Sequence, residues 1–505
     1  MNKLIFLVGG LLLLILVQCN VSQEEFADPA ELHKTYCGSC HLITDPTNIP
    51  KSIWKESVLP EMAARLGYIH NGYNPTSGVS MEEKVYIGMS GIYPKEAVID
   101  STTWRQIHDY IIAQAPESVP YDSLRSDRNS ELKQFVPSTV SLAKSNLAGI
   151  TNIHFEPSTK QTFVSDANGK SFVLQESDEI GLRFQSPVIS RKQKGEYLYV
   201  TEMGYMHPSE NPRGSIYRIT ANRIDTLAQK LHRPVFTEVA DLNGDDVDEI
   251  LISEFGNHTG ELSMLVQNES QFEKRTLLAV PGIINLAIAD MNKDGKKDIV
   301  VLASQGNEGI YMLYQEGELD FSAKHVLRFG PEHGSSWFQL VDYNGDQHLD
   351  IVLANGDNAD YSNFLKPYHG VRLFINNGKN EFSEEWFYPI YGATRVQCED
   401  YDMDGDLDIA VMAFFPDFDN AQEESFVWLE NTNSAQYDFV PHTHPKANSG
   451  RWMVMESADF DQDGDLDIML GSYLLPVDRR KYKSVIDTWM SEKADLLLLE
   501  NKAIE

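Results

Sequence analysis

Two cysteines and a histidine near the start of the chain stand at a spacing that suits covalent cofactor chemistry. Cys37 and Cys40 are separated by two residues, and His41 follows directly. Two thiols on one turn can form thioether bonds to the vinyl groups of a haem, and the next histidine can bind its iron. A redox dithiol would need a βαβ setting, which the neighbouring sequence lacks. The motif predicts one covalent haem c, held between helices expected over residues 29–36 and 101–115.

Four side chains are candidates for the second axial ligand of this haem. Met62, Met81 and Met89 each offer a neutral thioether, which suits an electron carrier. His70 would instead give a bis-histidine site. Any one of the methionines can equally be ordinary core packing, so the residues alone do not choose among them.

Residues 54–67 resemble a segment of a family of exported bacterial monohaem cytochrome domains. The resemblance rests on a tryptophan, a Val-Leu-Pro run, a methionine and an Arg-Leu-Gly run in this order, and on the closing pair Ala115–Pro116. It implies a cytochrome c domain over residues 24–117. It also implies that Met62 is the distal ligand, with Met89 as the runner-up.

The first residues of the chain predict export. An apolar run from Leu4 to Val17 covers 14 residues, too few to span a bilayer as a helix. Because this run ends just before Cys19, it resembles a bacterial lipoprotein signal over residues 1–19 with Cys19 as the lipidated residue. An ordinary secretory signal is the alternative. Lipidation would place the protein at the outer membrane or cell surface, on the periplasmic or extracellular face, held by its lipid anchor alone. The remaining cysteine, Cys398, is expected to be a buried thiol.

Farther along, one acidic pattern of nine residues recurs five times, with side-chain oxygens at positions 1, 3, 5 and 9. Calcium takes six to eight hard oxygen ligands in flexible geometry, which this spacing suits better than a soft transition metal. Up to five Ca²⁺ ions are therefore expected. The candidate ligands are Asp241, Asn243, Asp245, Glu249, Asp290, Asn292, Asp294, Asp298, Asp342, Asn344, Asp346, Asp350, Asp400, Asp402, Asp404, Asp408, Asp459, Asp461, Asp463 and Asp467.

The loops differ from the calcium loop of an EF-hand. That loop needs a glutamate at position 12, whereas every copy here has an apolar residue there, inside a stretch that predicts a strand. The starts of the copies are separated by 49, 52, 58 and 59 residues, a period that fits one four-stranded propeller blade per copy. The apolar residues are Ile252, Val301, Leu353, Val411 and Leu470.

The five loops resemble the FG-GAP or VCBS repeats of integrin-like propellers, which implies that calcium ties each loop between two blade strands. Position 6, usually a glycine in a left-handed turn, is Asp246 in the first loop and Gln347 in the third. These two loops are therefore expected to bind calcium more weakly or to stay empty.

The expected architecture is a small all-α cytochrome c domain followed by an all-β propeller. Two strand pairs upstream of the acidic loops look like blades without the loop, which gives seven blades, with six or eight as alternatives. The propeller is expected over residues 148–505. Polar residues without periodicity predict a linker over residues 118–147.

The charge balance excludes one class of partner. Against 42 Lys and Arg the chain carries 75 Asp and Glu, a formal charge of −33, whereas a nucleic-acid binder needs clustered cations. The five loops hold 21 of these carboxylates, so most of the excess is local.

Together these features predict a haem c electron-transfer lipoprotein with a redox partner protein and a calcium-stabilised propeller that binds or docks a protein or glycan. The alternatives are a haem-linked oxidoreductase or carbohydrate-active enzyme with its active site in the propeller funnel, or a surface adhesin. The sequence shows no convincing catalytic set. His207 and His333 follow blade strands at similar loop positions and are candidates for lining one face of the funnel.

Overall fold

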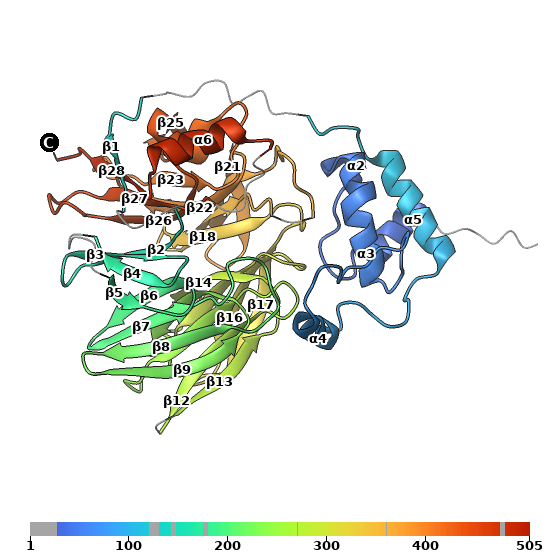
Figure 1. Ribbon diagram of the computed structural model, residues 1–505, viewed down its shortest axis with the longest axis horizontal. Coiled ribbons are helices and arrows are strands. Elements are labelled where there is room, and N and C mark those ends of the chain that lie inside the picture. The colour runs from blue at the N-terminus through green and yellow to red at the C-terminus, as the bar shows by residue number, and fades with distance from the viewer. Residues whose placement is uncertain are drawn as a thin grey trace, which may run out of the picture.

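A helical region lies beside a β-propeller in the computed structural model (Figure 1). The structure describes residues 28–120, 131–142, 148–174, 180–269, 271–359, 361–474 and 480–504. The predicted signal segment and Cys19 lie outside this part of the chain. Among the described residues, no helix is long and apolar enough to cross a membrane.

The helical region comprises residues 28–120. Its helices are α1 (Pro29–Cys37), α2 (Lys51–Ile53), α3 (Leu59–Arg65), α4 (Met81–Ser90) and α5 (Ser101–Gln114), with a π-helical turn at Trp54–Val58. The helices predicted over residues 29–36 and 101–115 are thus confirmed. Trp104, Ile107 and Ile111 of α5 are buried and form the core with Leu59 of α3, while Asp100 accepts two backbone N–H bonds at the start of α5.

The propeller consists of seven four-stranded antiparallel sheets. The first strand of each blade contacts the first strands of its neighbours, so these strands surround the axis. From the innermost strand outward the blades are β2 (Ile150–Glu156), β3 (Gln161–Asp166), β4 (Lys170–Val173), β5 (Ile180–Arg183); β6 (Val188–Lys194), β7 (Tyr197–Glu202), β8 (Gly214–Thr220), β9 (Arg223–Leu231); β10 (Pro234–Ala240), β11 (Glu249–Glu254), β12 (Glu261–Asn268), β13 (Gln271–Leu278); β14 (Ile283–Ala289), β15 (Asp298–Ala303), β16 (Gly309–Gln315), β17 (Phe321–Arg328); β18 (Ser335–Val341), β19 (Asp350–Asn355), β20 (Gly370–Asn376), β21 (Phe382–Pro389); β22 (Ala393–Glu399), β23 (Asp408–Ala413), β24 (Phe426–Asn433), β25 (Asp438–His442); and β26 (Trp452–Ala458), β27 (Asp467–Ser472), β28 (Leu496–Asn501), β1 (Phe135–Val140). A further helix, α6 (Lys483–Glu492), precedes β28.

The second strands explain why the sequence folds in this way. In the five blades with an acidic loop, these strands are β11, β15, β19, β23 and β27, and every residue in them is buried. A strand that is covered on both faces by neighbouring blades reads as a continuous apolar run rather than an alternating one. The prediction of seven blades is confirmed.

Strand β1 closes the ring and extends the propeller beyond its predicted start. Its residues fall in the segment 118–147 that the sequence predicts to be a linker, yet they form the outermost strand of the last blade. Phe135 pairs with Asn501 and its ring packs against Tyr401 and Trp428. Only Phe135 of this strand is fully buried, so the strand carries no apolar run that would reveal it.

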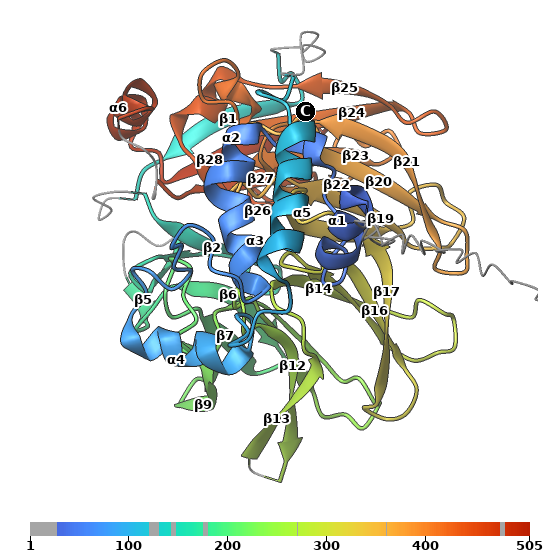
Figure 2. The same cartoon turned by 90° about the vertical axis from the view of Figure 1, so that its right-hand side faces the viewer.

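The helical region and the acidic loops lie at opposite ends of the propeller. Each acidic loop joins the first strand of a blade to the second, whereas the helical region contacts loops at the other ends of these strands. In Figure 2 the helices α2, α3 and α5 lie in front of the ring of blades.

Candidate functional site

The five acidic loops share one backbone conformation. Positions 4 and 6 of every loop have positive φ, the left-handed region that favours glycine. Asp246 and Gln347 adopt it at position 6 with φ of 65° and 69°, although neither is glycine. Each loop therefore carries one residue other than glycine in this region, at position 6 in the first and third loops and at position 4 in the other three, at a cost in backbone strain of about 1–2 kcal/mol.

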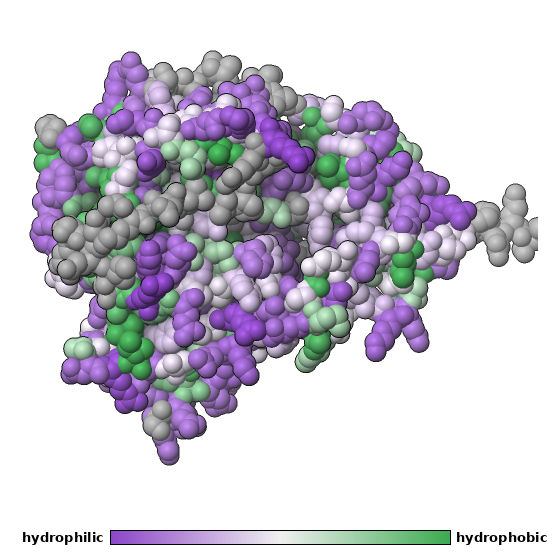
Figure 3. Space-filling view, viewed as in Figure 1, coloured by the Kyte–Doolittle hydropathy of each residue, from purple (hydrophilic) through white to green (hydrophobic). Residues whose placement is uncertain are grey.

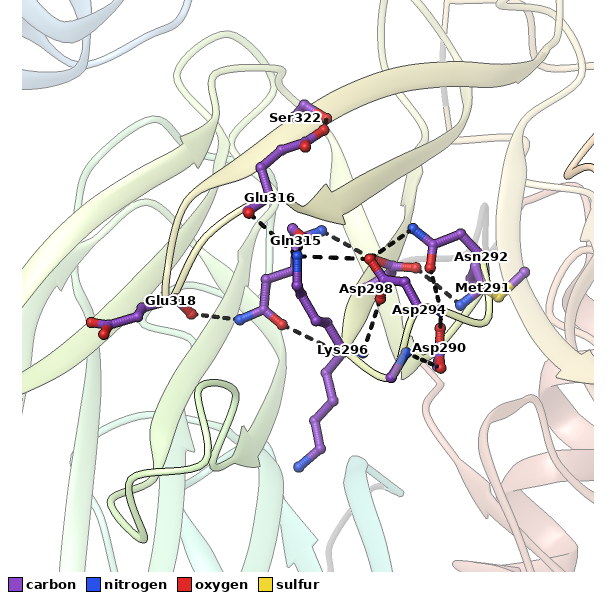
Figure 4. A network of polar contacts seen from close by, with 12 residues as sticks. Asp290, Met291, Asn292, Asp294, Lys296, Asp298, Gln315, Glu316, Glu318 and Ser322 are labelled. Atoms are coloured by element: carbon purple, nitrogen blue, oxygen red, sulfur yellow. Dashed lines mark hydrogen bonds and ion pairs between the residues drawn. The ribbon is translucent and has the colours of Figure 1, made fainter.

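The carboxylate at position 9 fastens each loop to the blade. These residues begin the second strand and are almost fully buried. In the second loop, Asp298 accepts the backbone N–H groups of Met291 at 3.0 Å and of Gln315 at 2.9 Å (Figure 4). Asp408 accepts those of Tyr401 and Asn431 in the same way. In the second to fifth loops, position 9 thus joins the loop and the second strand to the third strand. In the first loop, Glu249 accepts the backbone N–H of Leu242.

Several other loop carboxylates have one buried oxygen without a hydrogen-bond partner. In the last three loops, Oδ1 of the first aspartate has no partner among the described residues; these atoms belong to Asp342, Asp400 and Asp459. The same holds for Oδ1 of Asp406 and Asp465 at position 7 of the last two loops. Because a buried carboxylate oxygen without a partner costs free energy, these atoms are candidates to bind a cation.

The last two loops bring their ligand atoms closest together. Carboxylate oxygens of Asp400, Asp402 and Asp404 all lie within 4.8 Å of one another, and those of Asp459, Asp461 and Asp463 do the same. Burial, and then the charge of Asp404, raises the pKa of Asp402. The all-oxygen donor set fits a hard divalent cation such as calcium.

The first two loops differ from this arrangement. Oδ1 of Asp241 accepts the backbone N–H of Gly244 at 2.7 Å, and Oδ1 of Asp290 accepts that of Asp294 at 3.0 Å. Lys297 of the second loop also donates to the Asp241 carbonyl at 2.6 Å. Their first carboxylates are therefore satisfied by the protein itself, which the sequence pattern did not reveal.

The predicted haem motif lies at the end of α1. Cys37 is the last residue of this helix and packs against the core of the helical region, while Cys40 is exposed in the following turn. Burial raises the pKa of the Cys37 thiol to about 12. Nδ1 of His41 lies 2.8 Å from the Leu42 carbonyl oxygen, and it must donate its hydrogen to that acceptor. Nε2 of a neutral ring is then free to bind a metal.

The candidates for the distal ligand have different surroundings. Met62 in α3 is partly buried against the same core as Cys37. Met81 and Met89 lie on α4 and are each 78% exposed, and with Val85 they form an apolar outer side of this helix (Figure 3). Nδ1 of His70 accepts the Trp104 indole N–H at 3.3 Å, so this ring is engaged elsewhere.

A buried carboxylate beside Met62 was not anticipated from the sequence. Glu61 is fully buried and accepts hydrogen bonds from Tyr93 at 2.7 Å, Tyr73 at 2.9 Å and Arg65 at 3.0 Å. This network joins α3 to the loops before and after α4. Nothing in the local pattern marks it, because Tyr73 and Tyr93 follow Glu61 by 12 and 32 positions and come from separate loops.

Buried polar contacts join the helical region to the propeller. Glu332 accepts hydrogen bonds from the Thr44 hydroxyl at 2.7 Å and from the Asn48 amide at 3.1 Å. The backbone N–H of Glu210 donates to Glu83 at 2.6 Å. The two histidines proposed to line a funnel face have different aromatic neighbours. His333 packs against Phe329 and Tyr368, whereas His207 packs against Tyr205.

The fold and its loops define a seven-bladed β-propeller with FG-GAP-like repeats. The family model of the FG-GAP-like repeat matches residues 290–353 and 342–411, which include the second, third and fourth acidic loops. No curated protein matches the chain.

Similar solved structures include a gluconolactonase from Xanthomonas campestris, with 12% identity, coverage of 56% of this chain and 88% of that one, and a TM-score of 0.36. The propeller domain of Doa1 has 12% identity, coverage of 52% and 75%, and a TM-score of 0.34. The N-terminal domain of Nup159 has 9% identity, coverage of 74% and 96%, and a TM-score of 0.36.

Proposed function

We propose that the protein is an exported haem c electron-transfer lipoprotein whose calcium-stabilised propeller is a binding or docking module. The observation that carries this proposal is the turn after α1. There, one thiol lies at the core, a second follows within the turn, and the next residue has an imidazole nitrogen free for a metal.

The donor set of this region fits a haem. Cys37 and Cys40 would form the two thioether links, His41 would be the proximal ligand and Met62 the distal ligand. A bound haem would supply a one-electron redox couple. The chain's own residues would orient the ring and limit water: Leu42 is 42% exposed directly beside the motif, where it can cover the haem edge.

The unpartnered carboxylates of the last loops support bound calcium. Neighbouring carboxylates repel one another until a cation neutralises them, so calcium binding and loop stability are coupled. The first two loops have satisfied first carboxylates, which favours the later loops as the stronger sites. The calcium ions would be structural. They would lie at the end of the propeller opposite the helical region.

Export and lipidation at Cys19 rest on the sequence. They agree with the proposed haem, because thioether attachment to c-type motifs takes place after export. The redox partner is expected to be a protein and the propeller ligand a protein or glycan.

Absorption spectra of protein exported by a haem-maturing host test the proposal. We expect the wild-type chain to show a low-spin haem spectrum, and Cys40→Ser and His41→Ala to lose or alter it. Cys398→Ser is the matched control, since Cys398 is buried in the propeller as predicted. Met62→Ala should change the spectrum to that of high-spin iron, whereas Met89→Ala should leave it unchanged. A normal spectrum in His41→Ala would contradict the ligand assignment.

A further inference from the structure

One connection of the propeller reaches the core of the helical region. It joins β19 to β20 in the fifth blade, and the structure describes its residues 356–359 and 361–369. Its Phe364 packs against the buried core that contains Leu59 and Trp104. Cys37 and Met62 pack against the same core, and all other members of this cluster among the described residues belong to the helical region. A propeller side chain thus completes the core that carries two residues of the proposed haem site.

Buried polar groups hold Phe364 in this position. The side-chain amide of Asn358 donates to the Phe364 carbonyl at 2.8 Å, and Nζ of Lys366 donates to Oδ1 of Asn358 at 2.8 Å. Lys366 is fully buried, and its Nζ lies 5.5 Å from the centre of the Phe364 ring. Because a buried ammonium group is costly unless it is hydrogen-bonded, this arrangement favours one conformation of the connection. Phe364 is therefore preorganised to contact the helical region.

The same connection also contacts the segment that leads into α3. The Ser57 hydroxyl donates to the Tyr361 carbonyl at 2.6 Å. Ser57 lies in the π-helical turn that runs directly into α3, and α3 carries Met62. The connection therefore contacts the helical region at two points. One is the turn before the helix of Met62, and the other is the core against which Met62 packs.

A second set of contacts fixes the chain that follows the haem motif. Thr44 and Asn48 donate to Glu332, which lies between β17 and β18 and is almost fully buried. The Tyr368 hydroxyl, from the β19–β20 connection, donates to the Asn48 carbonyl at 3.2 Å. These bonds attach the chain a few residues after His41 to the propeller. They therefore limit the movement of the helical region relative to the β19–β20 connection.

We propose that the β19–β20 connection is part of the proposed haem site and that Phe364 is the positioning residue of Met62 within it. The inference rests on the proposed function, because it assigns Met62 to the haem iron. Apolar groups around a haem exclude water and thereby raise its reduction potential, since water stabilises the more highly charged ferric state. One loop of the propeller thus sets the potential at which the haem exchanges electrons.

A redox titration of the full-length holoprotein, followed by absorption, tests this role. In Phe364→Ala we expect a lower midpoint potential, because water gains access to the haem, and a weaker absorption band of methionine-ligated ferric iron. The ratio of ferric to ferrous haem at a fixed potential should rise at least threefold, which corresponds to about 30 mV for one electron. Phe364→Leu keeps an apolar side chain and should give intermediate values.

Phe382→Ala is the matched control. Phe382 is a partly buried phenylalanine of the same blade, but it begins β21 at the end that carries the acidic loops. Its loss removes a ring of the same size and should lower the thermal midpoint, while the redox midpoint and the methionine band keep their wild-type values. Measuring the thermal and the redox midpoint together therefore separates a general loss of stability from a change at the haem.

An unchanged redox midpoint and methionine band in Phe364→Ala would overturn the inference, and a lower thermal midpoint alone would make Phe364 a structural residue. Equal redox shifts in Phe364→Ala and Phe382→Ala would overturn it as well. If Phe364→Ala fails to fold, Phe364→Leu decides: wild-type values overturn the inference and a lowered redox midpoint supports it. A wild-type chain without haem would instead refute the proposed function. A wild-type haem without the methionine band would refute the assignment of Met62 and, with it, the role of Phe364.

Discussion

The Thr44 hydroxyl donates a 2.7 Å hydrogen bond to the Glu332 carboxylate, and both side chains are almost fully buried. These residues are 288 positions apart in the chain. The bond is one of several that attach the helical region to the loops of the propeller end opposite the acidic loops. It predicts that the two parts support each other's stability.

Thr44→Val tests this attachment. Valine keeps the shape of threonine but leaves one oxygen of a buried carboxylate without its donor, so stability should fall by about 1–3 kcal/mol. Differential scanning calorimetry should show the helical region unfolding at a lower temperature than in the wild-type protein. Thr432→Val, on an exposed hairpin, is the control. Equal losses in both variants would mean that the Glu332 contact contributes nothing specific.

Removal of calcium should destabilise the propeller. A ligand that binds only the folded protein adds RT ln(1 + [L]/Kd), about 2.7 kcal/mol at a hundredfold excess over Kd. We expect excess chelator to lower the thermal midpoint and calcium, but not magnesium, to restore it. The double variant Asp402→Asn/Asp461→Asn should show most of this loss without chelator. Asp438→Asn on an exposed hairpin is the control, and an unchanged midpoint in chelator would refute the calcium sites.

Ring closure by β1 predicts a large effect from one side chain. Phe135 is 2% exposed and packs edge-on against Tyr401 and Trp428. Phe135→Ala should cost about 3–5 kcal/mol, because it removes a large buried ring and leaves a cavity. Val136→Ala is the neighbouring control, since Val136 is 49% exposed and should change stability little. Urea unfolding measures both, and similar small losses would show that β1 does not close the ring.

Glu456 predicts a pH dependence of stability. Burial raises its pKa from 4.5 to about 7, although the charge of Arg395 on the adjacent inner strand opposes the rise. Because the folded state holds the proton more tightly than the unfolded state, this contribution to stability is present at low pH and lost as pH rises through about 7. Glu456→Gln should flatten the decline between about pH 4.5 and 7 in calcium-saturated buffer. An identical slope in both proteins would contradict this prediction.

The repeat made much of the fold predictable. Five copies of one loop, each followed by an apolar strand, determine the blade period and place the acidic residues between the first and second strands. The left-handed turns at position 6 follow from Gly295, Gly405 and Gly464, and Asp246 and Gln347 adopt the same turn because the rest of the loop imposes it.

Features that depend on distant partners were not predictable from local patterns. Strand β1 has one buried phenylalanine and pairs with Leu496–Asn501, the last strand of the chain. The Glu61 network and the Glu332 contacts likewise join residues from separate segments. The satisfied first carboxylates of the first two acidic loops depend on loop geometry, which the shared sequence pattern does not distinguish from that of the other loops.

The most direct test of the proposed function is the intact mass of the polypeptide exported by a haem-maturing host. The measurement is made under denaturing conditions, beside the double variant Cys37→Ser/Cys40→Ser. We predict that the wild-type polypeptide carries the additional mass of one haem and that the double variant carries none. A wild-type polypeptide without this added mass, in a host that matures another cytochrome c normally, would contradict the assignment of Cys37 and Cys40 to covalent haem.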